Sequence, residues 1–177
     1  MTMLDAIKLL MKRLSQDNQL EVVHSGHVWQ ASFQWAKQAS REQVQEVQIR
    51  LKNKLPNDYI AFLTQISNGA TLFYDSQYGQ WGFRLFGTDE LIERQVHWQK
   101  SIPVDWESRF IAFCELYGEA NVMVFDLSKP TANNESLAIV EASALDPIKY
   151  WPTASRSFHE WLDHLITAQG DKYWLWK

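Results

Sequence analysis

Two carboxylates in the second half of the chain are the residues best suited to acid–base chemistry. Glu115 closes one apolar run, Asp126 follows the next, and a hairpin-like junction lies between the runs. If these runs pair as antiparallel strands, Glu115 and Asp126 could approach each other across the hairpin and work as acid and base. A solvated rim of charge is the simpler interpretation. The sequence therefore keeps a small carboxylate-dependent hydrolase or ligand-binding enzyme only as an alternative.

Nucleophilic and metal chemistry have weaker support. Cys114 is the one cysteine and lies in an apolar strand pattern, where a thiol is buried and inert. His24 and His27 lie near each other in a polar stretch that offers no further ligand. His159 and His164 are five residues apart, which places them on different faces of a helix. No glycine-rich phosphate loop or Gly-x-Ser-x-Gly motif occurs, so we expect no catalytic residue, no metal site and no cofactor.

Three predicted loops combine carboxylates with large aromatic side chains, as protein-binding surfaces often do. Aromatic side chains anchor interfaces, and exposed charges steer association. The candidate partner-binding residues in these loops are Asp75, Tyr78, Asp105, Trp106, Glu107, Tyr117 and Glu119. An ordinary solvated loop is the simpler interpretation of each loop taken alone.

The elements that must position these loops begin with a helix and a strand. Residues 1–14 show an apolar face at helical spacing, and residues 29–35 alternate as a half-buried strand does. Ser40 with Gln43 three residues later is a capping-box pattern, which predicts a helix from Ser40 to about Lys52.

A short helix with both ends marked follows. Pro56 suits the first helical turn, because its fixed φ is already helical and its missing N–H costs nothing there. Asn68-Gly69 supplies residues that tolerate the left-handed conformation needed at a helix C-terminus, so we expect Gly69 to have a positive φ. The structural motif consists of Leu55, Pro56, Asp58, Tyr59, Asn68 and Gly69.

The rest of the chain is rich in predicted strands. We expect strands at 71–74, 80–86, 109–115, 121–127 and 136–142. Thr88 is expected to cap a helix, and Ser157 with Glu160 forms a second capping-box pattern. Strands clustered between helices predict an α+β fold, with a mainly antiparallel sheet of five to six strands flanked by four to five helices.

In this order the motifs resemble the SUKH superfamily, specifically its Smi/Knr-like branch. The resemblance rests on Leu55-Pro56, Asp58-Tyr59, Phe62-Leu63, Asn68-Gly69, Trp81-Gly82-Phe83 and the Ser157–Leu162 segment. It covers roughly residues 40–166. It implies a SUKH-like α+β domain over residues 40–177, with residues 1–39 as an N-terminal helix and extension packed on the core of one compact domain.

The resemblance also implies a non-catalytic protein-binding role. Many bacterial SUKH proteins are immunity proteins that neutralise toxins, and fungal relatives regulate cell-wall synthesis. We therefore expect an immunity-type protein, with a regulatory scaffold that has no toxin partner as a further alternative. The net charge of −4 permits a basic partner such as a toxin domain. The absence of a basic run argues against nucleic-acid binding.

Composition indicates a well-filled core and no membrane contact. Hydrophobic residues make up 46% of the chain and aromatic residues 14%, which is ample apolar surface to bury. No apolar run approaches the roughly 18 residues that a membrane-spanning helix needs. A single cysteine suits a reducing compartment. We expect a cytoplasmic protein, and the sequence leaves its oligomeric state open.

Overall fold

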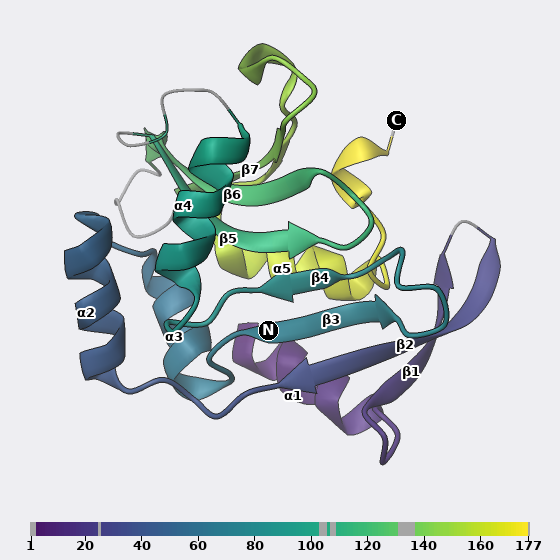
Figure 1. The fold of residues 1–177 in the computed structure, drawn as a ribbon. Helices are drawn as coiled ribbons and strands as arrows, with labels where there is room; N and C mark the ends of the chain where they lie inside the picture. Colours follow the sequence, from purple (N-terminus) through teal and green to yellow (C-terminus); the bar gives the residue numbers. More distant parts are fainter. Residues whose placement is uncertain (1–2, 25, 103–105, 107–108, 131–136, 177) are drawn as a thin grey trace.

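An antiparallel sheet in strict chain order forms the centre of the fold (Figure 1). The computed structural model describes residues 3–24, 26–102, 106, 109–130 and 137–176. These residues form eight strands, each hydrogen-bonded to its neighbour in sequence, together with five α-helices. The predicted α+β class is confirmed, and the sheet has eight strands where five to six were expected.

The elements follow one another with short connections. The strands are β1 Gln19–His24, β2 His27–Trp35, β3 Ala70–Asp75, β4 Phe83–Leu85, β5 Phe110–Leu116, β6 Asn121–Pro130, β7 Leu137–Ser143 and β8 Thr153–Ser155. The helices are α1 Met3–Arg13, α2 Arg41–Leu51, α3 Asn57–Gln65, α4 Leu91–Ser101 and α5 Phe158–Thr167. Two short 3-10 turns, η1 Ile148–Tyr150 and η2 Tyr173–Leu175, complete the described part of the chain.

Successive connections alternate between the two ends of the sheet, because each strand runs antiparallel to the one before it. The β1–β2, β3–β4, β5–β6 and β7–β8 connections lie at one end, which we call the turn end. The connections that contain α2, α3 and α4 lie at the other, which we call the helix end. In Figure 1 the arrows of β3 and β5 point toward the turn end.

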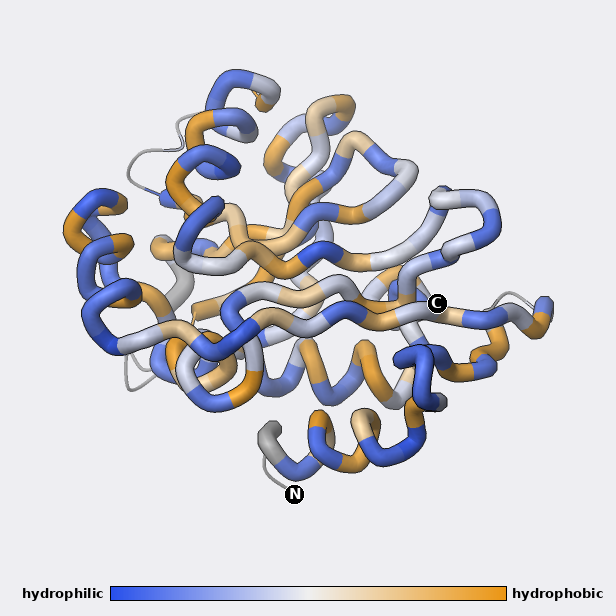
Figure 2. The backbone as a smooth tube through the Cα atoms, turned by 60° about the horizontal axis from the view of Figure 1, so that its bottom comes forward, coloured by the Kyte–Doolittle hydropathy of each residue, from blue (hydrophilic) through white to orange (hydrophobic). Residues whose placement is uncertain are grey.

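Helices α1 and α5 lie side by side against one face of the sheet, and Figure 2 shows the hydrophobic positions of α5 turned toward the strands. Ile7 and Leu10 of α1 and Val22 of β1 belong to the same hydrophobic core as the central strands. None of the helices in the described residues is long and apolar enough to cross a bilayer.

Five aromatic rings fill the space between the sheet, α3 and α5. Phe113 stacks on Phe125 with ring centroids 4.2 Å apart, and Tyr59 meets Phe158 edge-on at 4.9 Å. Trp161 closes the cluster against Phe113 at 5.3 Å. Offset and edge-on contacts of this kind stabilise aromatic pairs beyond the apolar area that they bury. The cluster therefore fixes α3 and α5 against β5 and β6.

The motif around Pro56 joins α3 to α5. Pro56 lies directly before the first residue of α3, and its φ of −59° suits that position. The carboxylate of Asp58 accepts hydrogen bonds from the backbone N–H groups of Tyr59 and His159, both at 2.9 Å. Burial raises the pKa of Asp58, although these N–H donors act in the opposite direction. Asp58 thus holds the start of α5 beside the start of α3.

Asn68-Gly69 marks a close crossing of two chain segments. Gly69 has the expected positive φ, +87°, but it does not cap α3, which ends at Gln65 with Ile66 as its cap. The Asn68 side chain accepts a hydrogen bond from the Thr88 backbone at 2.7 Å and donates one to the Thr88 hydroxyl at 2.9 Å. Thr88 was expected to cap the next helix, and that prediction is wrong. Helix α4 begins at Leu91 without a side-chain cap, because Thr88 is held by Asn68.

Gly69→Ala is expected to lower the free energy of unfolding by well over 1 kcal/mol, which is about the cost of a positive φ alone. A Cβ at this position would lie 2.8 Å from the Gly87 nitrogen and 3.0 Å from the Leu85 oxygen. Gly26→Ala is the matched control, because Gly26 also has a positive φ and no atom lies within 4 Å of its Cβ position. If urea unfolding showed the same loss of unfolding free energy for Gly69→Ala and Gly26→Ala, the close approach of Gly69 to the Leu85–Gly87 segment would be contradicted.

A glutamine side chain completes the free edge of β5. Strand β4 pairs with β5 only from Cys114 onward, so the backbone of β5 before that point lacks a neighbouring strand on this side. The Gln95 side chain of α4 accepts a hydrogen bond from the Ala112 N–H at 2.8 Å and donates one to the Phe110 carbonyl at 2.9 Å. Buried backbone groups need such partners. Sequence analysis missed Gln95, because its role depends on where α4 lies.

Candidate partner-binding surface

The β3–β4 turn presents a tyrosine on a rigid loop. The Asp75 carboxylate accepts hydrogen bonds from the backbone N–H groups of Gln77 and Tyr78, at 2.9 and 3.1 Å. The Asp75 carbonyl accepts another from Gly79 at 2.8 Å. Aspartate is favoured at such turns because its side chain can bond the backbone two residues later. The loop leaves Tyr78 69% exposed.

The β5–β6 turn lies directly against the β3–β4 turn. Tyr117 packs on Tyr74 with ring centroids 4.8 Å apart, and its backbone N–H donates to the Gly82 carbonyl at 3.0 Å. A Cβ on Gly118 would lie 2.4 Å from the Gln80 carbonyl oxygen, so only glycine allows this approach. The structure therefore brings Asp75, Tyr78 and Tyr117 together, as one surface at the turn end.

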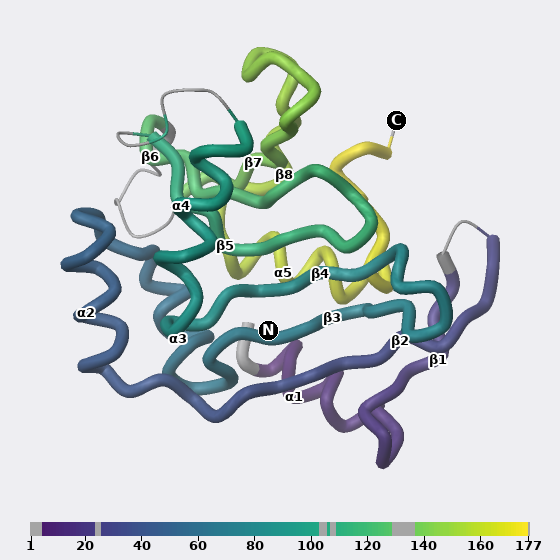
Figure 3. Tube along the Cα trace, viewed as in Figure 1, coloured from purple at the N-terminus to yellow at the C-terminus, as the bar shows by residue number. Residues whose placement is uncertain are grey.

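Glu119 is also at the turn end, but its carboxylate is paired within the chain. Glu119 forms an ion pair with Lys172, and the Lys172 ammonium lies 2.7 Å from the carboxylate of Glu141. The Trp174 indole donates to the other Glu141 oxygen at 2.6 Å. The C-terminal tail, yellow in Figure 3, passes the β5–β6 turn to make these contacts. Glu119 thus fastens the tail.

The third predicted loop does not join this surface. Trp106 lies in the β4–β5 connection, at the helix end, and is 2% exposed. Its indole N–H donates to the Ile102 carbonyl at 2.8 Å, and its ring packs on Phe110. The prediction of an exposed Trp106 anchor is wrong, because the ring is buried in the core against Phe110. Asp105 and Glu107 lie outside the described residues.

Large exposed apolar side chains are concentrated at the turn end. The described residues include ten of them, and only Leu9, Ile49 and Val96 belong to helices elsewhere. The other seven lie on the β1–β2, β3–β4 and β7–β8 hairpins and the tail: Val23, Val28, Tyr78, Leu145, Tyr150, Leu175 and Trp176. We define the turn-end surface as Asp75, Tyr78, Tyr117, Leu145, Tyr150, Leu175 and Trp176. Exposed apolar groups gathered in this way are typical of binding sites.

The two carboxylates considered for acid–base chemistry are far apart on the β5–β6 hairpin. Glu115 is in register with Val122, near the turn, whereas Asp126 is in register with Phe110, at the opposite end of the pairing. The prediction that Glu115 and Asp126 approach each other is therefore wrong. A pair sharing a proton or a water molecule cannot be built from them.

Each of the two carboxylates is instead held by its own arginine. Glu115 accepts hydrogen bonds from Arg94 at 3.2 Å and from the Trp98 indole at 3.1 Å. Asp126 forms an ion pair with Arg109 at 3.2 Å. Burial alone would raise the pKa of Asp126, but the hydrogen bonds from Arg109 and Ser128 hold it below its ordinary value. These are structural ion pairs.

The remaining reactive groups do not assemble into a site. Cys114 is fully buried, and burial raises the pKa of its thiol well above the ordinary value, which keeps it protonated. Within the described ranges, no group of three or more His, Cys, Asp or Glu side chains is arranged to hold a metal ion.

The sequence model of the SMI1/KNR4 family (SUKH-1) matches residues 38–164. The chain belongs to this family. The match includes the Leu55-Pro56 and Asn68-Gly69 motifs and confirms the resemblance seen in the sequence. SUKH proteins are known for toxin-immunity and related roles and are generally non-catalytic. A comparison with curated proteins finds no match.

The SUKH-1 match does not extend over the whole turn end. It contains the β3–β4 and β5–β6 turns and the β7–β8 connection, but it stops before the tail that carries Leu175 and Trp176. It also begins after β1 and β2. The turn-end surface therefore combines family elements with segments that the family model does not describe.

Proposed function

We propose that this SUKH-1 protein is a non-catalytic immunity protein that holds a toxin domain on its turn-end surface. The observation that supports this most strongly is that Tyr78, Tyr150 and Trp176, each more than 60% exposed, all belong to the turn-end connections and the C-terminal tail. Tyrosine and tryptophan are the residues that most often dominate binding energy in protein interfaces. The rigid turns beneath them reduce the entropy lost on binding.

A basic toxin domain fits this surface best. The chain carries a net charge of −4, so its overall field attracts a cationic partner. Asp75 adds a carboxylate beside Tyr78. Since Glu119 is paired with Lys172, steering is expected to depend mainly on Asp75 and on the net charge. The apolar side chains would then determine how long the complex lasts.

The test requires a neighbouring gene that encodes a toxin domain, and the product of that gene is the partner in the binding measurements. Tyr78→Ala is expected to raise the Kd by at least about tenfold, mainly by faster dissociation. Asp75→Asn is expected to slow association, since it removes the charge but keeps the oxygen that shapes the turn. Association should also slow as salt rises, because exposed charges are screened within about 10 Å at 0.1 M ionic strength.

The matched control is Val96→Ala, which trims an exposed aliphatic side chain at the helix end and should leave the Kd unchanged. Co-expression provides the functional readout, in which the wild-type protein should restore growth of cells that produce the toxin domain and Tyr78→Ala should restore it less. Growth that the wild-type protein fails to restore would refute the immunity role. Equal Kd values for Tyr78→Ala and Val96→Ala would refute the proposal that the toxin domain binds at the turn-end surface.

A further inference from the structure

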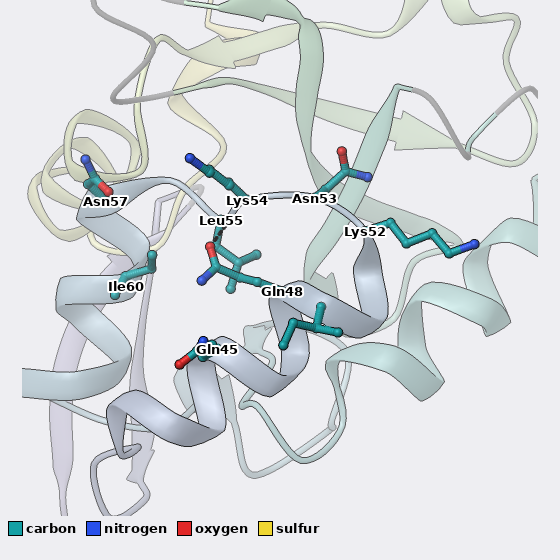
Figure 4. A pocket seen from close by; sticks show the side chains of 9 residues that line it. Gln45, Gln48, Lys52, Asn53, Lys54, Leu55, Asn57 and Ile60 are labelled. Atoms are coloured by element: carbon teal, nitrogen blue, oxygen red, sulfur yellow. Dashed lines mark hydrogen bonds between the residues drawn. The ribbon is translucent and has the colours of Figure 1, made fainter.

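Two open hollows flank the connection between α2 and α3, at the helix end of the molecule. The first has a volume of about 680 Å³ and lies between α2 and α3. Figure 4 shows Gln45 and Gln48 of α2 on one side of it, Ile60 and Asn57 of α3 on the other, and Leu55 between the helices. The second has a volume of about 350 Å³ and lies between the end of α2 and α4. Lys52 and Asn53 line both, so the two hollows form one continuous surface.

The charged residues that line this surface are all cations. Arg50, Lys52 and Lys54 are its charged residues, and no Asp or Glu is among the described residues lining either hollow. None of the three forms an ion pair with the described part of the chain. A helix C-terminus favours a cation such as Arg50 in its last turn, but that effect does not reach Lys54. Three cations that have no carboxylate partner among the described residues are a distinct feature of a chain with a net charge of −4.

Each hollow also exposes an aliphatic side chain. Ile49 lines the first hollow and is 69% exposed, and Val96 lines the second and is 43% exposed. The β3–β4 turn and the tail are at the opposite end of the sheet, so these two residues are not part of the turn-end surface. Cations around exposed aliphatic groups suit an occupant that has carboxylates around an apolar side chain.

The connection between the hollows is already rigid. Lys52 ends α2 in the left-handed conformation, with a φ of 55°, and its N–H donates to the last carbonyls of the helix. The Gln48 side chain then accepts a hydrogen bond from the Leu55 N–H at 2.9 Å. The Asn53 side chain donates to the Leu51 carbonyl at 3.2 Å. A surface preformed in this way requires little reordering when it binds.

We propose that the surface formed by Ile49, Arg50, Lys52, Lys54 and Val96 binds an acidic segment of a second protein, with an aliphatic side chain of that segment seated beside Ile49. This site is independent of the proposed toxin-binding surface and is at the opposite end of the sheet. Both surfaces can therefore be occupied at once. The protein would then connect a basic partner at its turn end with an acidic partner at its helix end.

The test measures the fluorescence anisotropy of labelled peptides of about 15 residues added to the full-length protein. One peptide carries glutamates around leucines at helical spacing, and a second has the same glutamates with every leucine replaced by serine. The first should bind, and the second should bind at least about tenfold more weakly. Arg50→Glu combined with Lys54→Glu should weaken binding of the first peptide at least about tenfold. Ile49→Ser should weaken it as well.

The control variant makes the same change in net charge elsewhere, by combining Lys8→Glu with Lys149→Glu, and it should bind the leucine peptide as the wild type does. Melting curves establish that each variant remains folded. Equal losses in the two charge-reversal variants, or equal binding of the two peptides, would overturn the proposal. A labelled uridine oligonucleotide of the same length that binds more tightly than the leucine peptide would also overturn it. Ile49→Ser keeps the net charge and lies far from the turn-end surface, so it should not change toxin binding, and the two proposals can fail separately.

Discussion

Lys172→Met is expected to lower the free energy of unfolding by about 3–5 kcal/mol, which is typical when one partner of a buried ion pair is removed. The Lys172 side chain is 10% exposed and lies between the carboxylates of Glu119 and Glu141. Glu141 is itself only 4% exposed at its side chain. Glu141 would keep its hydrogen bonds from Asn121 and Trp174 but would lose its ion pair with Lys172. A buried carboxylate without a counter-charge is costly.

Urea unfolding at neutral pH measures this loss, with Lys149→Met as the control. Lys149 is exposed, so the same change of side chain there should alter stability by no more than about 0.5 kcal/mol. Adding Glu141→Gln to Lys172→Met should recover part of the loss, because it removes the charge that was left uncompensated. If Lys172→Met were no more harmful than Lys149→Met, the tail would not be fastened by this ion pair.

Tyr59→Ala is expected to cost about 3–5 kcal/mol, as large-to-small substitutions of buried aromatic residues do. Tyr59 is 0% exposed and contacts Phe113, Phe125 and Phe158 in the central aromatic cluster. Its hydroxyl donates to the carbonyl of Phe86, in the segment that crosses Asn68-Gly69. The residue therefore supports both the packing of α3 and the position of the β4–α4 connection.

Tyr59→Phe separates these two contributions. It keeps the ring but leaves the Phe86 carbonyl without the hydroxyl, and a buried acceptor that loses its partner costs about 1–3 kcal/mol. Thermal or urea unfolding should rank the variants as wild type, Tyr59→Phe and Tyr59→Ala in decreasing stability. Tyr78→Ala removes an exposed tyrosine and should lie close to wild type. A Tyr59→Ala protein as stable as Tyr78→Ala would contradict the role of the cluster.

Local signals in the sequence predicted most of the helices. The Ser40 capping box is present, with reciprocal hydrogen bonds between Ser40 and Gln43 at 2.8 and 3.2 Å. The second predicted capping box, at Ser157 and Glu160, has only one of its two hydrogen bonds. Ser157 accepts from the Glu160 N–H, but the Glu160 carboxylate turns to the Arg156 N–H and the Ser155 hydroxyl. The spacing of residues can show that a helix starts, whereas the partner of a side chain depends on the chain that precedes the helix.

The last strand of the sheet carried no signal in the sequence. Strand β8 has three residues, which are too few to show an alternation. It is a strand only because Ser155 and Thr153 pair with Ile139 and Val140 of β7. Pairing of this kind is a tertiary contact, so periodicity within one segment cannot reveal it.

The candidate surface was predicted in part, because loops can be recognised locally but their neighbours cannot. Tyr78 and Tyr117 lie in loops that the sequence indicated, and they meet because the order of the strands places their turns at the same end. The charge of Glu119 looked available in the sequence. Its partner Lys172 is 53 residues further along the chain, and composition gives no sign of this contact. Trp106 shows the same limitation, since an aromatic residue in a loop can equally well be exposed or seal a core.

The alternation of the connections between the two ends of the sheet affects where the sequence can change during evolution. Each turn at the turn end joins two adjacent strands, so it can gain or lose residues without altering the register elsewhere in the sheet. The connections at the helix end cannot vary so freely, because α3 and α4 supply Tyr59 and Gln95 to the interior. Insertions and deletions should therefore accumulate at one pole of the molecule, so that new binding specificities can arise there while the scaffold stays constant.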